Sequence, residues 1–88
     1  MIEFDTRVTN KIGMHLRAAG EFVKLASKFS SEVFVIKNGK RANGKSILGL
    51  ASLAIGRHTK ITIQVDGDDE KEAKEAIKEL IRNNFYEE

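Results

Sequence analysis

The chain has 88 residues, of which 41% are hydrophobic and 32% are charged, and its net charge is +2. This composition is too apolar for a disordered chain, and the length allows one small domain but no second core. Cysteine is absent, which excludes disulfides and thiolate metal sites, and no apolar run approaches membrane-spanning length, so we expect a cytoplasmic protein without membrane insertion.

Two segments with different periodicities begin the chain. Apolar or β-branched residues alternate with charged or polar ones from Ile2 to Thr9, which predicts a half-buried strand. After a loop at 10–13, apolar residues recur at three- and four-residue steps from Leu16 to about Phe29, which predicts an amphipathic helix.

The middle of the chain predicts a hairpin followed by a short helix. Residues 33–37 are rich in β-branched and aromatic side chains. Asn38-Gly39 is the preferred type I′ turn, so residues 40–42 should pair back antiparallel. Ser46 should cap the short apolar helix that follows, and Gly56 is placed to end it.

A last strand and helix complete the pattern. Residues 60–65 alternate again, and Gly67-Asp68 turns the chain. We expect Asp69 and Glu72, three residues apart, to form an Asp version of the capping box at the start of a helix that runs to about Asn84.

The predicted order of elements is therefore β-α-β-β-α-β-α. Each strand has mostly one apolar face and each helix one inward stripe. This favours an α+β open-faced β-sandwich, in which a four-stranded antiparallel sheet is covered on one side by three helices. Residues 1–88 form a single predicted domain without linkers or repeats.

His15 is the candidate functional residue, because it stands where the first loop meets the first helix. The first turn of a helix presents unpaired N–H groups and the positive end of the helix dipole, which favour an oxyanion such as phosphate. A neutral imidazole nitrogen is a good nucleophile toward phosphorus. Arg17, two residues on, adds donors suited to phosphoryl oxygens. The pattern predicts a phosphohistidine site.

Two blocks of sequence resemble the HPr family, the histidine-containing phosphocarriers of the bacterial sugar phosphotransferase system. The first is Asn10-x-x-Gly13-Met14-His15-x-Arg17, and the second is Ala42-Asn43-Gly44-Lys45-Ser46-Ile47-Leu48-Gly49-Leu50. The resemblance implies a monomeric carrier that is not an enzyme. It would accept a phosphoryl group on His15 from phosphorylated enzyme I, with the help of Arg17, and pass it to enzyme IIA domains. It implies no metal and no organic cofactor.

The chain departs from the family pattern at two positions. Ala18 stands where the family usually has proline, and Leu16 stands where it usually has a small residue. Alanine still allows a helix to start, although it does not preset the first turn as proline does. Leu16 places bulk beside the reacting atom, which can change access or the choice of partner.

Ser46 has a structural and a regulatory interpretation. Its hydroxyl should cap the second helix. The resemblance implies, in addition, phosphorylation by an HPr serine kinase/phosphorylase and recognition by a transcriptional regulator. Ile47 and Leu48 cannot both face the core on so short a helix. Together with Leu16 and Ala51 they are the predicted partner-binding residues.

Three alternatives remain to be weighed. A regulatory binding module of the same fold, such as a nitrogen-related or catabolite-control paralogue, would act mainly through protein contacts. Residues 39–46 match the G-x-x-x-x-G-K-[ST] phosphate loop, but that site needs a parallel sheet and Asn38-Gly39 predicts an antiparallel pair. Nucleic-acid binding is disfavoured, because the strands offer no pair of exposed aromatic residues for stacking. His58, in a loop, is interpreted as a solvated residue.

Overall fold

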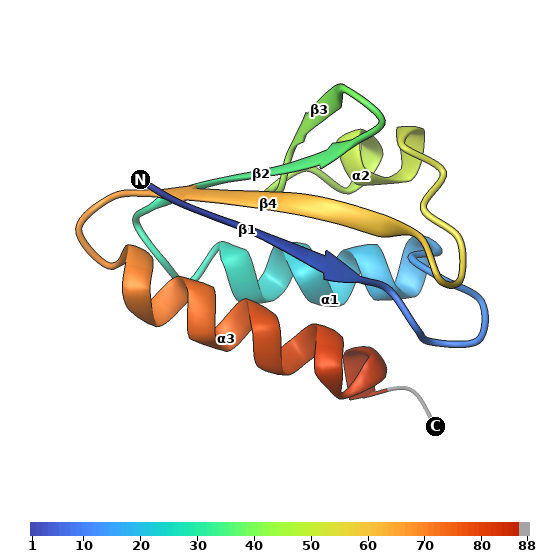
Figure 1. The fold of residues 1–88 in the computed structure, drawn as a ribbon. Coiled ribbons are helices and arrows are strands. Elements are labelled where there is room, and N and C mark those ends of the chain that lie inside the picture. Colours follow the sequence, from blue (N-terminus) through green and yellow to red (C-terminus); the bar gives the residue numbers. More distant parts are fainter. Residues whose placement is uncertain (87–88) are drawn as a thin grey trace.

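The computed structural model describes residues 1–86 and has the predicted order of elements (Figure 1). The fold is the predicted open-faced sandwich, and a short 3-10 turn, Asn84–Tyr86, follows the last helix. The strands and helices are β1 (Ile2–Arg7), α1 (Leu16–Ala26), β2 (Glu32–Lys37), β3 (Lys40–Asn43), α2 (Ile47–Ser52), β4 (Lys60–Asp66) and α3 (Glu70–Arg82).

The four strands form one antiparallel sheet in the order β1-β4-β2-β3. In the register, Phe4 faces Ile63, and Ile63 in turn faces Val35, so a row of apolar side chains crosses the sheet. The helices lie on one face of the sheet (Figure 1), and no helix within residues 1–86 covers the other face. This one-sided cover explains the period-two burial along the strands.

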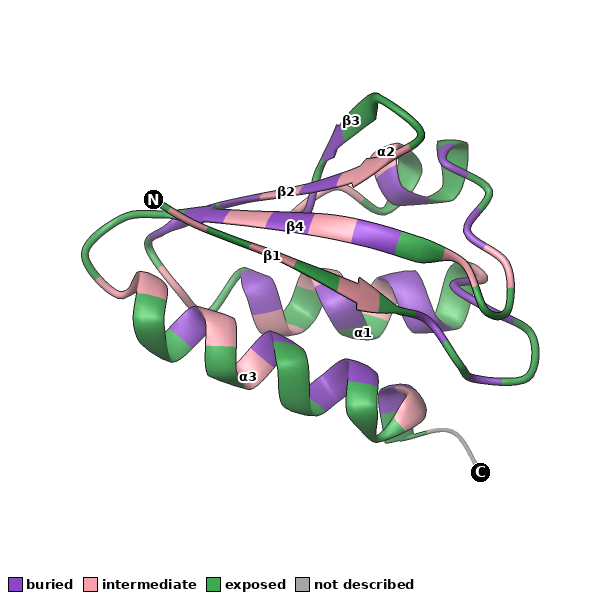
Figure 2. Ribbon diagram, viewed as in Figure 1, coloured by how far each residue is buried: buried purple, intermediate pink, exposed green. Residues whose placement is uncertain are grey.

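The core lies between the sheet and the helices (Figure 2). Its largest fully buried side chains come from every layer: Phe22, Phe85, Leu50, Ile61, Ile63, Ile77, Val8, Val33, Val35 and Val65. Apart from Phe85, which lies in the 3-10 turn after the last helix, these residues occupy inward positions of the predicted strands and helices. Val8 belongs to the predicted first strand, although β1 itself ends at Arg7. The core therefore follows from the periodicity of the sequence.

The hairpin between β2 and β3 has the predicted turn. Asn38 has a φ of 50° and Gly39 a φ of 82°. Both values are positive, as a type I′ turn requires. The prediction from the Asn-Gly dipeptide is confirmed, and β3 extends one residue beyond it, to Asn43.

Two predicted helix ends are wrong. The first helix ends at Ala26 rather than near Phe29, with Ser27 as its C-cap. The second ends at Ser52, and Ala54, not Gly56, adopts the left-handed conformation after it, with a φ of 51°. The Lys37 ammonium donates to the carbonyls of Leu53 and Ala54. The last carbonyls of the helix, of Leu50 and Ala51, accept from the N–H groups of Leu53 and Ala54, as at a helix end closed by glycine, and Lys37 of β2 binds the two carbonyls that follow.

The predicted capping pair of Asp69 and Glu72 is also wrong. The Asp69 carboxylate makes no capping bond to its own helix. It accepts hydrogen bonds from the backbone N–H groups of Ser30 and Ser31 and from the Ser31 hydroxyl. These bonds, the hydroxyl first, lower the pKa of Asp69 to about 2. Asp69 therefore ties the start of α3 to the turn before β2.

No helix within residues 1–86 is long and apolar enough to cross a membrane.

Candidate functional site

His15 is the N-cap of α1. Its backbone is extended, and its side chain accepts a hydrogen bond at Nδ1 from the backbone N–H of Arg17, at 3.2 Å. The His15 carbonyl accepts the first helical bond, from Ala19 at 2.8 Å. The imidazole is half-buried, and the structure places it where the sequence predicted, against the first turn of a helix.

The loop before His15 is held by backbone contacts. Gly13 has a φ of +82°, and a Cβ built on it would lie 2.6 Å from the Ile55 carbonyl oxygen. The next N–H, of Met14, donates to that same oxygen at 2.8 Å, and the Met14 side chain is buried in the core. The Asn10 side-chain amide donates to the Gly13 carbonyl at 2.6 Å. The motif residues Asn10, Gly13 and Met14 therefore position His15.

The two departures from the family pattern have clear places in the structure. Ala18 is fully buried, and α1 begins at Leu16 without the proline. The Leu16 side chain is 68% exposed and adds an aliphatic surface beside His15. Arg17 is exposed as well, so its guanidinium is available to an incoming anion.

Ser46 is the N-cap of α2, as predicted. Its hydroxyl oxygen accepts from the Gly49 N–H at 3.0 Å, and its carbonyl accepts from Leu50. A substituent on Oγ would lie beside Ile47 and Leu48, the next two residues of the chain.

Exposed aliphatic side chains lie on α1, on α2 and on the loop before α1. Leu48 is 82% exposed, Ile47 is 38% exposed, and Ala51 is also exposed, whereas Leu50 alone of this helix is buried. Sequence reasoning missed Ile12, which is 69% exposed in the loop before His15. An apolar residue within the otherwise polar or glycine-containing stretch 10–13 was the available signal.

The phosphate-loop interpretation of residues 39–46 does not fit the structure. The N–H groups that would have to cradle a phosphate are used within the protein: Gly44 donates to Val33, Lys45 to the Asn43 side chain, and Ser46 to Asn43. The Lys45 ammonium donates to the Phe29 carbonyl at 2.8 Å. The sheet is also antiparallel throughout, so this segment is not a nucleotide site.

His58 lies exposed in the loop before β4, with a φ of 68°. Its N–H donates to the Val8 carbonyl and its carbonyl accepts from Arg7, so its backbone ties this loop to the end of β1. Within residues 1–86, no three histidine, cysteine or acidic side chains are grouped to hold a metal.

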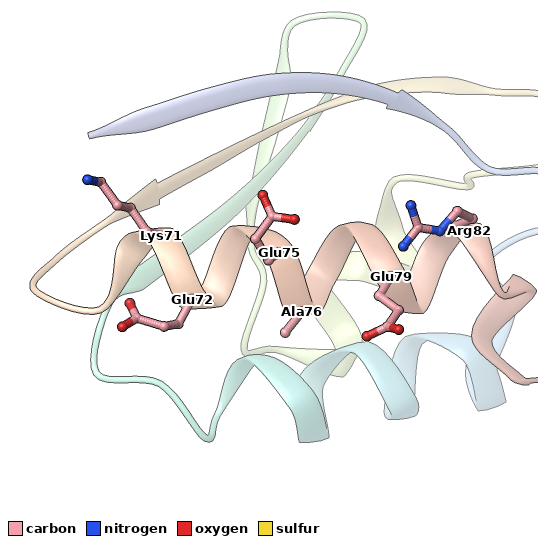
Figure 3. Close-up of a pocket in the computed structure, with 6 residues that line it drawn as sticks. All are labelled: Lys71, Glu72, Glu75, Ala76, Glu79 and Arg82. Atoms are coloured by element: carbon pink, nitrogen blue, oxygen red, sulfur yellow. The ribbon is translucent and has the colours of Figure 1, made fainter.

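The pocket in Figure 3 runs along α3. It is lined by Lys71, Glu72, Glu75, Ala76, Glu79 and Arg82, all from this one helix. Most of these side chains are charged, and none belongs to the predicted site.

The fold and the histidine at a helix N-terminus define the class of protein. The sequence model described as "PTS HPr component phosphorylation site" matches residues 2–83. "Phosphocarrier protein HPr" of Neisseria meningitidis (strain Z2491) is 46% identical over 87 residues, covering 99% of this chain and 98% of the relative. "HPr-like protein Crh" of Halalkalibacterium halodurans is 48% identical over 77 residues, covering 88% of this chain and 92% of the relative.

A solved structure matches as well. The crystal structure of HPr-C-His from Thermoanaerobacter tengcongensis superimposes with a TM-score of 0.96 at 43% identity, covering 100% of this chain and 99% of that one. The chain belongs to the HPr family of phosphocarrier proteins of the phosphotransferase system, whose members are phosphoryl carriers and not enzymes.

Proposed function

We propose that the chain accepts a phosphoryl group on His15 from phosphorylated enzyme I and donates it to enzyme IIA components of sugar uptake. The observation that carries this proposal is the imidazole at the N-cap of α1, with Nδ1 accepting the Arg17 N–H. In a neutral ring with Nδ1 as acceptor, the proton is on Nε2, and Nδ1 holds the lone pair that attacks phosphorus.

The transfer balances without a cofactor. The bond from phosphorus to Nδ1 of His15 forms as the bond from phosphorus to the donor nitrogen breaks, and donation to enzyme IIA reverses the roles. The oxygens of a phosphoryl group on Nδ1 lie at the positive end of α1, where the Arg17 N–H and guanidinium can donate to them. The chain contributes positioning and charge compensation.

The exposed aliphatic residues beside this site supply the partner-binding surface of the proposal. Leu16 follows His15 directly, and α2, which packs against α1, presents Ile47, Leu48 and Ala51. Exposed apolar side chains of this kind suit the uncharged centre of a transient interface, and charged groups around them suit its rim.

Phosphorylation of Ser46 by an HPr serine kinase/phosphorylase is the proposed regulation. A phosphate on Oγ adds up to two negative charges next to Ile47 and Leu48. Charge at that position opposes docking of a partner that buries the two aliphatic side chains. The same phosphate is a candidate recognition mark for a transcriptional regulator.

A regulatory binding module is the second candidate, favoured by the identity with the Crh relative. This function would use the Ser46 surface without phosphoryl transfer through His15. The N-cap geometry of His15 supports the carrier function instead, because a purely regulatory surface needs no nucleophile at a helix start.

The decisive experiment is incubation with enzyme I and phosphoenolpyruvate. We expect one acid-labile, alkali-stable phosphate on the chain, lost in His15→Ala and retained in the control His58→Ala. Equal labelling of the His15 variant contradicts the site assignment. Absence of labelling in the parent chain, with phosphate accepted at Ser46 from a serine kinase, favours the regulatory module.

A further inference from the structure

The charges of the chain are segregated along the sequence. Residues 6–20 and 33–65 contain no aspartate or glutamate. The two segments hold nine of the fifteen lysines and arginines: Arg7, Lys11, Arg17, Lys37, Lys40, Arg41, Lys45, Arg57 and Lys60.

The sheet brings part of both segments to one end. Arg7, the last residue of β1, pairs with Lys60, the first residue of β4. The Arg7 guanidinium donates to the His58 carbonyl at 2.6 Å, and this bond fixes it beside the loop that carries Arg57. Asp5 reaches this end and contacts Lys60 at 3.6 Å, so Lys60 is partly neutralised.

The β2–β3 hairpin and the loop before His15 lie at the same end of the sheet as Arg7 and Lys60. Lys37 pairs with Lys40 across the turn, and the Lys37 ammonium donates to the Ala54 carbonyl at 2.6 Å. The neighbouring Ile55 carbonyl holds Met14, next to His15. Figure 1 shows the start of α1 and the segment before β4 at the right, and the β2–β3 turn at the top of the view, above α2. We call these cations the basic end: Arg7, Lys11, Arg17, Lys37, Lys40, Arg41, Arg57 and Lys60.

The opposite end is acidic. Glu32 pairs with Asp66 across β2 and β4, and the N-terminal ammonium contacts Asp66 at 3.7 Å and Glu70 at 3.4 Å. Figure 1 shows the N-terminus and the turn from β4 to α3 at the left, away from the start of α1. The net charge of +2 therefore conceals a strong charge separation along the molecule.

Large aliphatic side chains are exposed on the segments that carry the cations. Ile12 and Leu16 flank His15, and Leu48 is on α2, the helix that follows the hairpin; each is at least 68% exposed. Cations around exposed aliphatic side chains are the combination that binds the interface of an anionic bilayer.

We propose that the basic end binds peripherally to anionic phospholipid headgroups, so that the chain is concentrated at membrane surfaces. The cations come from separate strands, turns and a helix start. Anionic lipid headgroups present an extended array of negative charges, which can attract cations spread over several elements. Stacking on nucleic acid bases is disfavoured because Arg41 already covers the Phe34 ring, at 3.6 Å from its centroid.

Vesicle sedimentation with the unphosphorylated chain tests the proposal. The probes are phosphatidylcholine vesicles with and without 30% phosphatidylglycerol, at low and at high salt. We expect binding only to the anionic vesicles at low salt. The triple variant Lys40→Gln/Arg41→Gln/Arg57→Gln should weaken it by up to about a hundredfold, at roughly fivefold for each cation near the surface.

The matched control is Lys71→Gln/Lys74→Gln/Lys78→Gln on α3, which makes the same change in net charge. It should retain most of the binding, and circular dichroism of both variants checks their fold. Absence of binding to anionic vesicles overturns the proposal, as does equal weakening by the two triple variants. Tighter binding to a short DNA duplex than to vesicles at equal phosphate concentration assigns the basic end to nucleic acid instead. Because His15 phosphorylation is not measured, failure here leaves the carrier function unaffected.

Discussion

Gly13→Ala tests whether the backbone before His15 is held as tightly as the contacts indicate. The new methyl group would lie 2.6 Å from the Ile55 carbonyl oxygen and 2.7 Å from two backbone atoms of Gly56. None of these atoms belongs to a flexible side chain that could turn away. The loop or the segment after α2 must therefore move.

The loss of unfolding free energy in Gly13→Ala has two parts. A φ of +82° holds the alanine in the left-handed region, at about 1–2 kcal/mol. Movement of the loop weakens the bond between the Met14 N–H and the Ile55 carbonyl, which contributes about 0.5–1.5 kcal/mol. We expect a loss of about 2–3 kcal/mol, equivalent to a fall in Tm of about 10–20 °C for a domain of this size.

Gly20→Ala is the matched control, because nothing lies within 4 Å of a Cβ built on Gly20, in the middle of α1. This change should stabilise the protein by about 0.5–1 kcal/mol. Urea unfolding followed by circular dichroism measures both variants, and phosphate uptake on His15 measures the site. A Gly13 variant within 0.5 kcal/mol of the parent, with unchanged uptake, would refute the role assigned to this loop.

Three further predictions concern charge and capping. The pKa of Asp69 is lowered to about 2 from 3.8, so its carboxylate stabilises the fold above pH 4, and this stabilisation is lost as the pH falls toward 2. The Asp69→Asn variant should therefore show a flatter decline in Tm between pH 5 and pH 2 than the parent chain. An unchanged decline contradicts this prediction. Arg17→Ala should slow phosphoryl transfer by about 2–4 kcal/mol in activation free energy with little change in stability, and a rate within twofold of the parent counts against it. Ser46→Ala should cost roughly 1 kcal/mol in urea unfolding but accept phosphate on His15 almost normally. Ser46→Asp should keep its stability and lose uptake from enzyme I, and uptake at the parent rate would leave Ser46 as a cap alone.

Much of the fold could be predicted because burial follows short-range periodicity. The alternation at 60–65 and the three- and four-residue steps after Leu16 correspond to β4 and α1. The Asn38-Gly39 turn is encoded by two adjacent residues, since Asn and Gly tolerate positive φ better than other residues do. Local patterns of this kind can be recognised from the sequence alone.

Features that depend on distant residues could not be predicted in the same way. Asp69 is a plausible N-cap by its position, but Ser30 and Ser31, from another part of the chain, take its carboxylate. Lys37, from β2, binds the Leu53 and Ala54 carbonyls just after α2, a contact that the residues of this helix do not indicate. When a helix end is predicted from the residues of the helix alone, hydrogen-bonding partners from other parts of the chain are left out.

The candidate site depends both on a local sequence pattern and on contacts between residues that are distant in sequence. The motif identified His15 because a histidine before a helix already implies N–H groups and a favourable dipole. It did not show that the Ile55 carbonyl, forty residues away in sequence, holds Met14 and blocks any side chain at Gly13. The glycine of the motif therefore serves a tertiary contact as well as a turn. For this reason a substitution that leaves every polar group in place can still displace the imidazole, and the stability and the phosphate uptake of the Gly13 variant should fall together.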